Sequence, residues 1–106
     1  MTDFRIFLVV FFGMFVLISC QTSHRISGDQ AFELKQYSVA IPLLIEKFDD
    51  EKNVIEKSVQ AKKIAESYKK LQQNSNRLEW YQKAYQAVED PNTLYEIGLS
   101  LKALER

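Results

Sequence analysis

Small and apolar residues recur in this chain at a long interval, and this internal repetition limits the possible folds more than any other feature. Gly28, Ala65 and Gly98 each open a stretch in which apolar residues follow every three or four positions, and these stretches begin 37 and 33 residues apart. Three- and four-residue spacing is the period of an α-helix, and beyond Ser27 the alternating pattern typical of a strand is almost lacking. The sequence therefore predicts an all-α fold made of similar units of about 34 residues.

The residues inside these stretches resemble the tetratricopeptide repeat, a helical hairpin in which small residues let two antiparallel helices pack closely. Leu44 and Tyr81 stand at the family's large inward position, and Ala84 stands at its small position. Lys47 and Arg77 depart from the pattern, because the family usually has small residues there. The resemblance implies about two and a half repeats. The apolar periodicity and the turn residues predict five helices, over about 28–36, 38–50, 54–72, 76–89 and 92–105, paired as hairpins with the last one unpaired.

A plain helical bundle or hairpin without any repeat relationship is the alternative, because periodic apolar residues do not by themselves separate the two folds. Aromatic residues at helical spacing are expected in the core of either fold rather than in a ligand cage: Tyr68, Trp80, Tyr81 and Tyr85. Trp80 is expected to be partly exposed, because its neighbour Tyr81 takes the inward position. Pro42 is expected in the opening turn of its helix, where a missing backbone N–H is tolerated.

The N-terminal segment has the pattern of an export signal. Residues 6–18 form a run of thirteen uncharged residues that follows Arg5. A membrane-spanning helix needs about 20 apolar residues, whereas the apolar part of a signal peptide has roughly 7–15. The run ends in Leu17-Ile18-Ser19-Cys20, which resembles the lipobox of bacterial lipoproteins.

The lipobox resemblance implies a signal peptide over residues 1–19, cleavage before Cys20, and a diacylglyceryl group on the Cys20 thiol with further fatty acylation, such as palmitate. Residues 20–27 then form the lipidated end and a polar tether, and residues 28–106 form the repeat domain. An uncleaved anchor with an unmodified cysteine, or cleavage by the general signal peptidase, is the alternative. Gln21 follows the cysteine, and the family's inner-membrane retention signal is an aspartate there. The resemblance thus favours the outer membrane, on its periplasmic side.

A lipobox, a short tether and helical repeats in this order resemble the N-terminal region of Bacteroidota envelope lipoproteins. Some of those belong to the type IX secretion and gliding apparatus, and others continue into an OmpA-like domain. The resemblance implies an adaptor or scaffold that is anchored in the membrane and binds other envelope proteins. The alternative is a structural N-terminal fragment of a larger envelope lipoprotein, with no binding role of its own.

No motif of an enzyme is visible. The chain lacks a glycine-rich phosphate loop, a Cys/His metal spacing and a nucleophile with a nearby base. Lysine plus arginine and aspartate plus glutamate both total 14, which does not suggest a nucleic-acid partner. His24 is a lone histidine and is interpreted as a solvated residue of the tether. We therefore expect no enzymatic activity, no metal, no small-molecule substrate and no cofactor other than the lipid on Cys20.

The most specific binding prediction concerns the inner face of the repeat array, which the first helix of each hairpin lines in the tetratricopeptide family. By that register seven residues face a groove: Lys62, Glu66, Lys69, Lys70, Tyr95, Leu99 and Lys102. With more lysine than acid, such a groove favours an extended segment that carries carboxylates. Ordinary solvation of the helix faces is the alternative.

Overall fold

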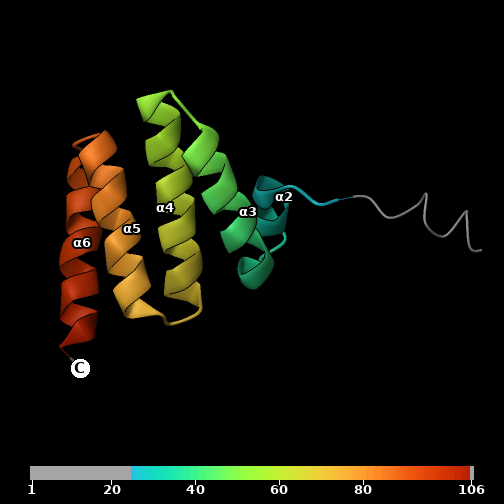
Figure 1. Cartoon of the computed structure of the whole chain (residues 1–106). Helices are drawn as coiled ribbons and strands as arrows, with labels where there is room; N and C mark the ends of the chain where they lie inside the picture. Colours follow the sequence, from blue (N-terminus) through green and yellow to red (C-terminus); the bar gives the residue numbers. More distant parts are fainter. Residues whose placement is uncertain (1–24, 106) are drawn as a thin grey trace, which may run out of the picture.

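The computed structural model describes residues 25–105, so Cys20 and the signal-like segment lie outside the described part. Between residues 25 and 105 the chain forms helices and no strand. These helices are α2 (Gly28–Glu33), α3 (Tyr37–Asp50), α4 (Val54–Lys70), α5 (Asn74–Ala87) and α6 (Pro91–Leu104). Each helix packs mainly on its neighbours in the chain, and successive helices run side by side in alternating directions (Figure 1). The predicted all-α fold of helical hairpins is confirmed.

Two of the hairpin turns are built alike. Lys35 and Gln72 both have a φ of 59°, and in each turn the next residue donates a backbone hydrogen bond of 2.9 Å to a carbonyl five residues earlier. A residue in this left-handed conformation ends a helix, because it turns the backbone away from the helix axis. Helices α2 and α4 therefore end at Glu33 and Lys70, before the predicted positions 36 and 72. The two turns lie 37 residues apart, as do Gly28 and Ala65, so the internal repetition extends to backbone geometry.

The starts of α2, α4 and α6 carry polar side-chain caps that satisfy free backbone N–H groups. Ser27 and Gln30 form a reciprocal capping box at α2, with two hydrogen bonds of 3.1 Å. The side chain of Asn53 accepts from two backbone N–H groups at the start of α4, and Asp90 caps α6 just before Pro91. These caps determine where α2, α4 and α6 begin, and therefore which of their side chains face the inner side of the array.

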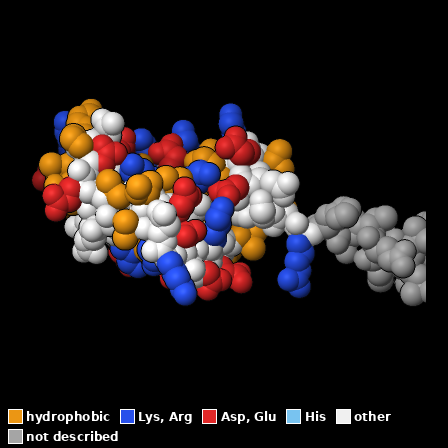
Figure 2. Space-filling view, turned by 90° about the horizontal axis from the view of Figure 1, so that it is seen from above, with side chains coloured by type: hydrophobic (Ala, Val, Ile, Leu, Met, Phe, Trp, Pro, Cys, Tyr) orange, Lys and Arg blue, Asp and Glu red, His pale blue; other side chains and the backbone are white. Residues whose placement is uncertain are grey.

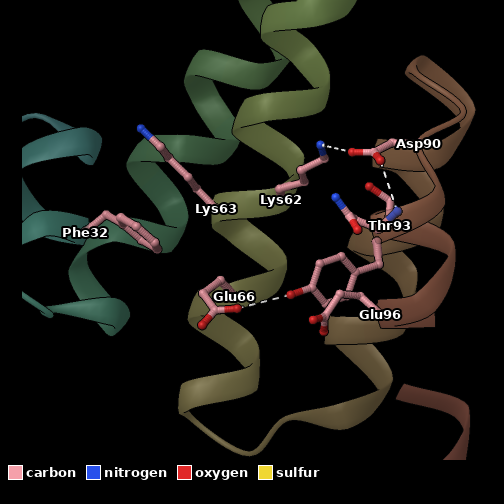
Figure 3. Close-up of a pocket in the computed structure, with 9 residues that line it drawn as sticks. Phe32, Lys62, Lys63, Glu66, Asp90, Thr93 and Glu96 are labelled. Atoms are coloured by element: carbon pink, nitrogen blue, oxygen red, sulfur yellow. Dashed lines mark hydrogen bonds and ion pairs between the residues drawn. The ribbon is translucent and has the colours of Figure 1, made fainter. Parts of the chain in front are cut away.

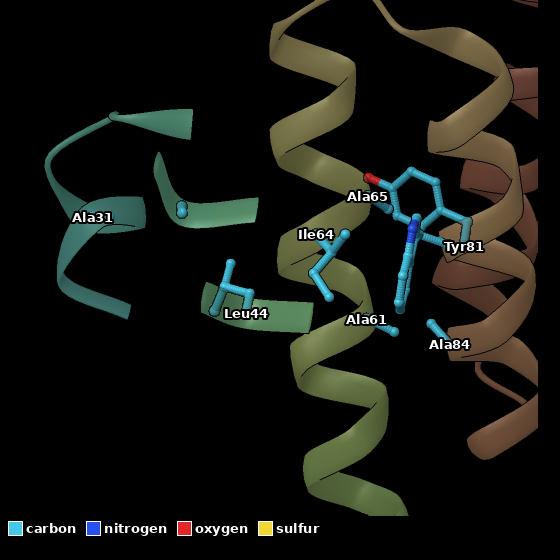
Figure 4. Packing of buried hydrophobic residues seen from close by; sticks show 9 residues of the cluster. Ala31, Leu44, Ala61, Ile64, Ala65, Tyr81 and Ala84 are labelled. Carbon is cyan, nitrogen blue, oxygen red and sulfur yellow. The ribbon is translucent and has the colours of Figure 1, made fainter. Parts of the chain in front are cut away.

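The core lies along the contact of α3, α4 and α5. Its buried members combine five alanines with four large side chains, Leu44, Ile64, Trp80 and Tyr81. Figure 4 shows Ala65 of α4 beside the ring of Tyr81, and Ala61 of α4 facing Ala84 of α5. Leu44, Tyr81 and Ala84 have exposed fractions of 0%, 4% and 0%, which confirms their predicted inward positions. Alanines at a helix contact let two backbones approach, and a neighbouring aromatic ring fills the remaining space.

Two expectations about single residues are wrong. Trp80 is buried together with Tyr81, because its ring packs edge-on against Phe48 at 5.1 Å and the ammonium group of Lys83 covers it at 4.1 Å. Pro42 is the sixth residue of α3 and so lies beyond its opening turn. The helix continues through it, and Pro42 itself is exposed to solvent.

The two departures from the family pattern have different outcomes. Lys47 is exposed and pairs with Asp29 of α2, so its position needs no small residue. Arg77 is buried at 7% exposure, and its guanidinium lies 3.6 Å from the carboxylate of Glu96 on α6. A large side chain is therefore accommodated at the α5–α6 contact by an ion pair. Within residues 25–105, no helix has the length and apolar character that crossing a membrane requires.

Candidate functional site

A pocket of about 340 Å³ opens on the inner face of the array. Its lining comes from four helices and the α5–α6 loop: Phe32, Lys62, Lys63, Glu66, Tyr81, Asp90, Asn92, Thr93 and Glu96. Figure 3 shows the ring of Phe32 on one side, Asp90, Thr93 and Glu96 on the other, and Glu66 between them. Because α4 carries three of these residues within two turns, one face of one helix forms the middle of the site.

The upper edge of the pocket is an ion pair that joins α4 to the start of α6. Lys62 donates to Asp90 at 2.9 Å, and the other carboxylate oxygen of Asp90 accepts from the backbone of Asn92 at 3.0 Å. The hydrogen bond from Lys62 and then that from Asn92 lower the pKa of Asp90 below its usual value. The carboxylate that caps α6 thus also positions Lys62, whose side chain is held toward α6 (Figure 3).

At the N-terminal end of the array, the carboxylate of Asp29 connects three helices. Asp29 of α2 accepts from Lys47 of α3 at 2.6 Å and from Lys63 of α4 at 3.0 Å. The hydrogen bond from Lys47 lowers the pKa of Asp29, partial burial opposes this change, and Lys63 reinforces it. The same contact raises the pKa of Lys47. The short helix α2 is thereby connected to both α3 and α4, which holds Phe32 at the rim of the pocket.

The floor of the pocket is polar. The hydroxyl of Tyr81 donates to Glu66 at 3.1 Å. Burial, followed by the charge of Glu66, raises the pKa of Tyr81, so the phenol stays protonated and remains a donor. Glu66 also lies 3.9 Å from the ammonium group of Lys70, one helical turn along α4. The carboxylate of Glu66 is thus oriented by a neutral donor from the core and a cation at the surface.

The α6 side of the pocket contains buried polar atoms that lack hydrogen bonds. Glu96 lies 3.6 Å from both Lys69 and Arg77, yet its Oε2 atom has no hydrogen-bond partner among the described residues. The hydroxyl of Thr93, which is 2% exposed, is also without a partner in this part of the chain. Buried polar atoms are usually paired, so unpaired ones beside a pocket mark a place where a ligand or water completes the bonding.

The seven residues predicted to face a groove are divided between two hollows and the exposed surface. Lys62 and Glu66 line the pocket described above. A smaller hollow of about 280 Å³ farther along the same face contains Lys69, Leu99 and Lys102, with Arg77 and Ala103. Lys70 is exposed and contacts the first pocket only through Glu66. Tyr95 lines neither hollow, and with 67% exposure it points into solvent from α6.

The pocket also contains residues that sequence reasoning did not place there, chiefly Phe32, Lys63, Thr93 and Glu96. A signal for the last two was present, since Thr93 and Glu96 lie three residues apart and so share one face of α6. No local signal existed for Phe32, which reaches the site only because α2 is short and packs across α3. The ion pairs were equally invisible, because Lys62–Asp90 and Lys63–Asp29 join residues 28 and 34 positions apart.

Acid should weaken the array through the Asp29 contacts. Because the folded pKa of Asp29 is lowered, its pairing stabilises the fold fully above the unfolded pKa of about 3.9 and is lost as the pH falls through the lower folded value. We expect the urea midpoint to fall between pH 7 and pH 3, and to fall less in Asp29→Asn, which has no such contact to lose. Asp49→Asn, at an exposed position of α3, is the control and should keep the wild-type difference. An unchanged acid response in Asp29→Asn would contradict this assignment.

The carboxylates of the pocket are held by neighbouring side chains: Asp90 by Lys62, Glu66 by the hydroxyl of Tyr81, and Glu96 by Lys69 and Arg77. Residues 25–105 contain no group of three or more His, Cys, Asp or Glu side chains placed to hold a metal ion. Comparison of the chain with family models, curated proteins and solved structures gave no significant match. The resemblance to tetratricopeptide lipoproteins therefore stays a prediction.

Proposed function

We propose that the protein is a lipid-anchored adaptor of the bacterial cell envelope, which holds a segment of a partner protein in the groove on its inner face. The observation that carries this proposal is the pocket of about 340 Å³ to which four helices contribute side chains. A binding surface needs apolar area together with a few polar groups that set orientation. Phe32 supplies an aromatic surface, while Glu66 and the α6 residues supply the polar groups.

The charge arrangement narrows the kind of segment that fits. Lys62, Lys69 and Lys70 each lie within 3.9 Å of a carboxylate, so their charges are largely compensated. A strongly acidic segment would compete with these internal pairs for the same ammonium groups. The proposal therefore favours an extended segment of mixed character, with an apolar side chain against Phe32 and hydrogen-bonding groups toward Glu66 and Thr93.

The anchor is the second part of the proposal, and it rests on the lipobox resemblance at Cys20. A fully extended tether of seven residues reaches roughly 25 Å. Lipidation at Cys20 would therefore keep the groove close to the membrane surface, where other envelope proteins present their periplasmic segments. An outer-membrane, periplasm-facing location and the absence of enzymatic activity belong to the same proposal.

Filling the groove tests the binding role. Asn92 is exposed and lines the pocket, so Asn92→Trp should place a bulky ring in the groove without removing an ion pair. We expect at least a tenfold loss of the partner proteins that co-purify with the wild-type protein from cross-linked envelopes, measured by quantitative mass spectrometry. The reason is steric, because the indole occupies the volume that the partner segment would fill.

The matched control is Gln82→Trp, which adds the same ring at an exposed position of α5 that does not line the pocket. Circular dichroism should show the same helix content for both variants and the wild type. Partners that survive Gln82→Trp and disappear with Asn92→Trp support the groove. Equal retention by both variants would overturn it and would favour a purely structural role for the repeats.

A further inference from the structure

The outer face of α6 has the composition of a helix contact but is covered by nothing in the described part of the chain. Leu94, Leu101 and Tyr95 are 52%, 49% and 67% exposed. Gly98 is the residue at the centre of this face, and a Cβ atom added there would meet no atom within 4 Å. Figure 2 shows apolar side chains at the α6 end of the array. A helix surface of this kind usually packs against a neighbour.

The chain itself shows how such a face is used. Ala61 and Ala65 of α4 precede Leu94 and Gly98 by 33 residues, and both alanines are fully buried under α5. The equivalent positions of α6 have no covering helix among the described residues. The α6 face therefore repeats an interface that the array already contains, with a glycine in place of the central alanine.

The α6 face is complementary to itself. At 100° per residue, Gly98 lies in the middle of the exposed arc, Leu94 and Leu101 lie on one side, and Tyr95 and Lys102 lie on the other. Consider a second copy related by a two-fold axis that lies between the helices at Gly98 and is perpendicular to both. The second helix then runs in the opposite direction, and each side of one helix faces the same side of the other. Leu94 then faces Leu101 of a second copy, and Tyr95 faces Lys102 of that copy. The first pair is apolar, and the second suits a cation–π contact.

We propose that α6 pairs with α6 of a second copy of this chain, antiparallel and centred on Gly98. Glycine at the crossing point lets the two backbones approach closely, which brings the flanking leucines into contact. The two matched pairs and the central glycine distinguish a second copy from an unrelated helix, whose side chains would have to supply both complements independently. The proposal does not depend on the larger pocket, whose α6 residues Thr93 and Glu96 lie away from Leu94 and Leu101. Lys102 alone borders both the smaller hollow and the α6 face.

Cysteine cross-linking of the full chain in cells tests the pairing and its direction. Gly98→Cys should form a disulfide-linked dimer after mild oxidation, because residue 98 faces its own counterpart within the roughly 7 Å that a disulfide requires. We expect at least five times more dimer on a non-reducing gel than for the wild type, which retains Cys20 and so reports any background at that cysteine.

Direction is tested by two further positions. In the antiparallel pair, residue 94 lies about 12 Å along the axis from its own counterpart, so Leu94→Cys and Leu101→Cys should each remain at the wild-type level. The double variant, with cysteines at both positions, should form the dimer, because each one faces the other in the second copy. These two cysteines are too far apart on one helix to join within a chain.

Every outcome decides the proposal. Dimer from Gly98→Cys and from the double variant, with neither flanking single variant above the wild type, supports it. Strong cross-linking of the single variant Leu94→Cys would mean that the two helices pair in parallel or collide at random, and it would overturn the proposal. Absence of dimer from Gly98→Cys also overturns it, and indicates that another protein or further chain covers α6. Adding Leu101→Glu to Gly98→Cys should reduce the dimer at least fivefold, while the helix content stays unchanged because Leu101 is exposed in the single copy.

Discussion

Replacing Leu44 by alanine should lower the free energy of unfolding by about 2–5 kcal/mol. Leu44 has no exposed surface, and it is in contact with the end of the array as well as with its centre. A Cβ atom added at Gly28 would lie 3.0 Å from Leu44, which shows how closely α2 approaches this side chain. The cavity left by the substitution would lie between helices that are fixed by turns and ion pairs, so little collapse can offset it. Urea unfolding followed by circular dichroism measures the change.

The matched control is Leu34→Ala, the same substitution at a position that is 62% exposed. Surface substitutions usually change stability by no more than about 0.5 kcal/mol. A mesophilic domain of this size has a total stability of only several kcal/mol, so the Leu44 variant should unfold at distinctly lower urea. Similar small effects for both leucines would contradict the assignment of Leu44 to the core and the hairpin register built on it.

Replacing Cys20 by serine should abolish fatty-acid labelling completely and remove the contribution of the acyl chains to membrane binding. Cys20 is the only cysteine of the chain, so no other thiol can accept the diacylglyceryl group. Each buried methylene adds about 0.8 kcal/mol to membrane binding, and two or more chains are needed for stable anchoring. Cells fed an alkyne fatty acid should label the wild type and not the variant, and fractionation of the same cells measures the membrane-bound share.

Ser23→Ala serves as the control, because it changes a hydroxyl residue in the proposed tether without touching the lipobox. It should keep both the label and the membrane location. If Cys20→Ser keeps the label of the wild type, the lipoprotein part of the proposal fails. The label is the deciding measurement, because an uncleaved variant keeps the apolar run of residues 6–18. The groove and its test with Asn92→Trp would stand unaffected, since they rest on residues 25–105.

The fold was predictable where residue size and period carried the information. Leu44, Tyr81 and Ala84 were placed correctly, because their spacing left one helix face for the core. The ends of the helices were harder to predict from the sequence. A left-handed residue ends both α2 and α4, and in both turns it is not a glycine, so composition gave no warning. Trp80 shows a second limit, since its burial depends on Phe48 and Lys83, which approach it from other turns and helices.

The groove was predictable only in part. Lys62 and Glu66 were found, because a single helix face determines their direction. Their partners Asp90 and Tyr81 were not linked to them, because those contacts depend on how α5 and α6 pack. At Gly98 the repeat pattern predicts a contact that is not present among the described residues. Gly98 matches Ala65 by position, but Ala65 is buried, whereas a Cβ atom added at Gly98 would meet open space. A repeat pattern gives the shape of a contact surface but does not say whether that surface is covered.

Because each helix packs mainly on the helix next to it in the sequence, this domain should fold rapidly. Because α2 packs on α3, α3 on α4, α4 on α5 and α5 on α6, the domain requires few pairings between distant parts of the chain. Such topologies fold quickly, since little loop-closure entropy is lost before each contact forms. The hairpins can therefore become ordered one after another while later residues are still being synthesised, and each finished hairpin offers the next helix a surface on which to assemble.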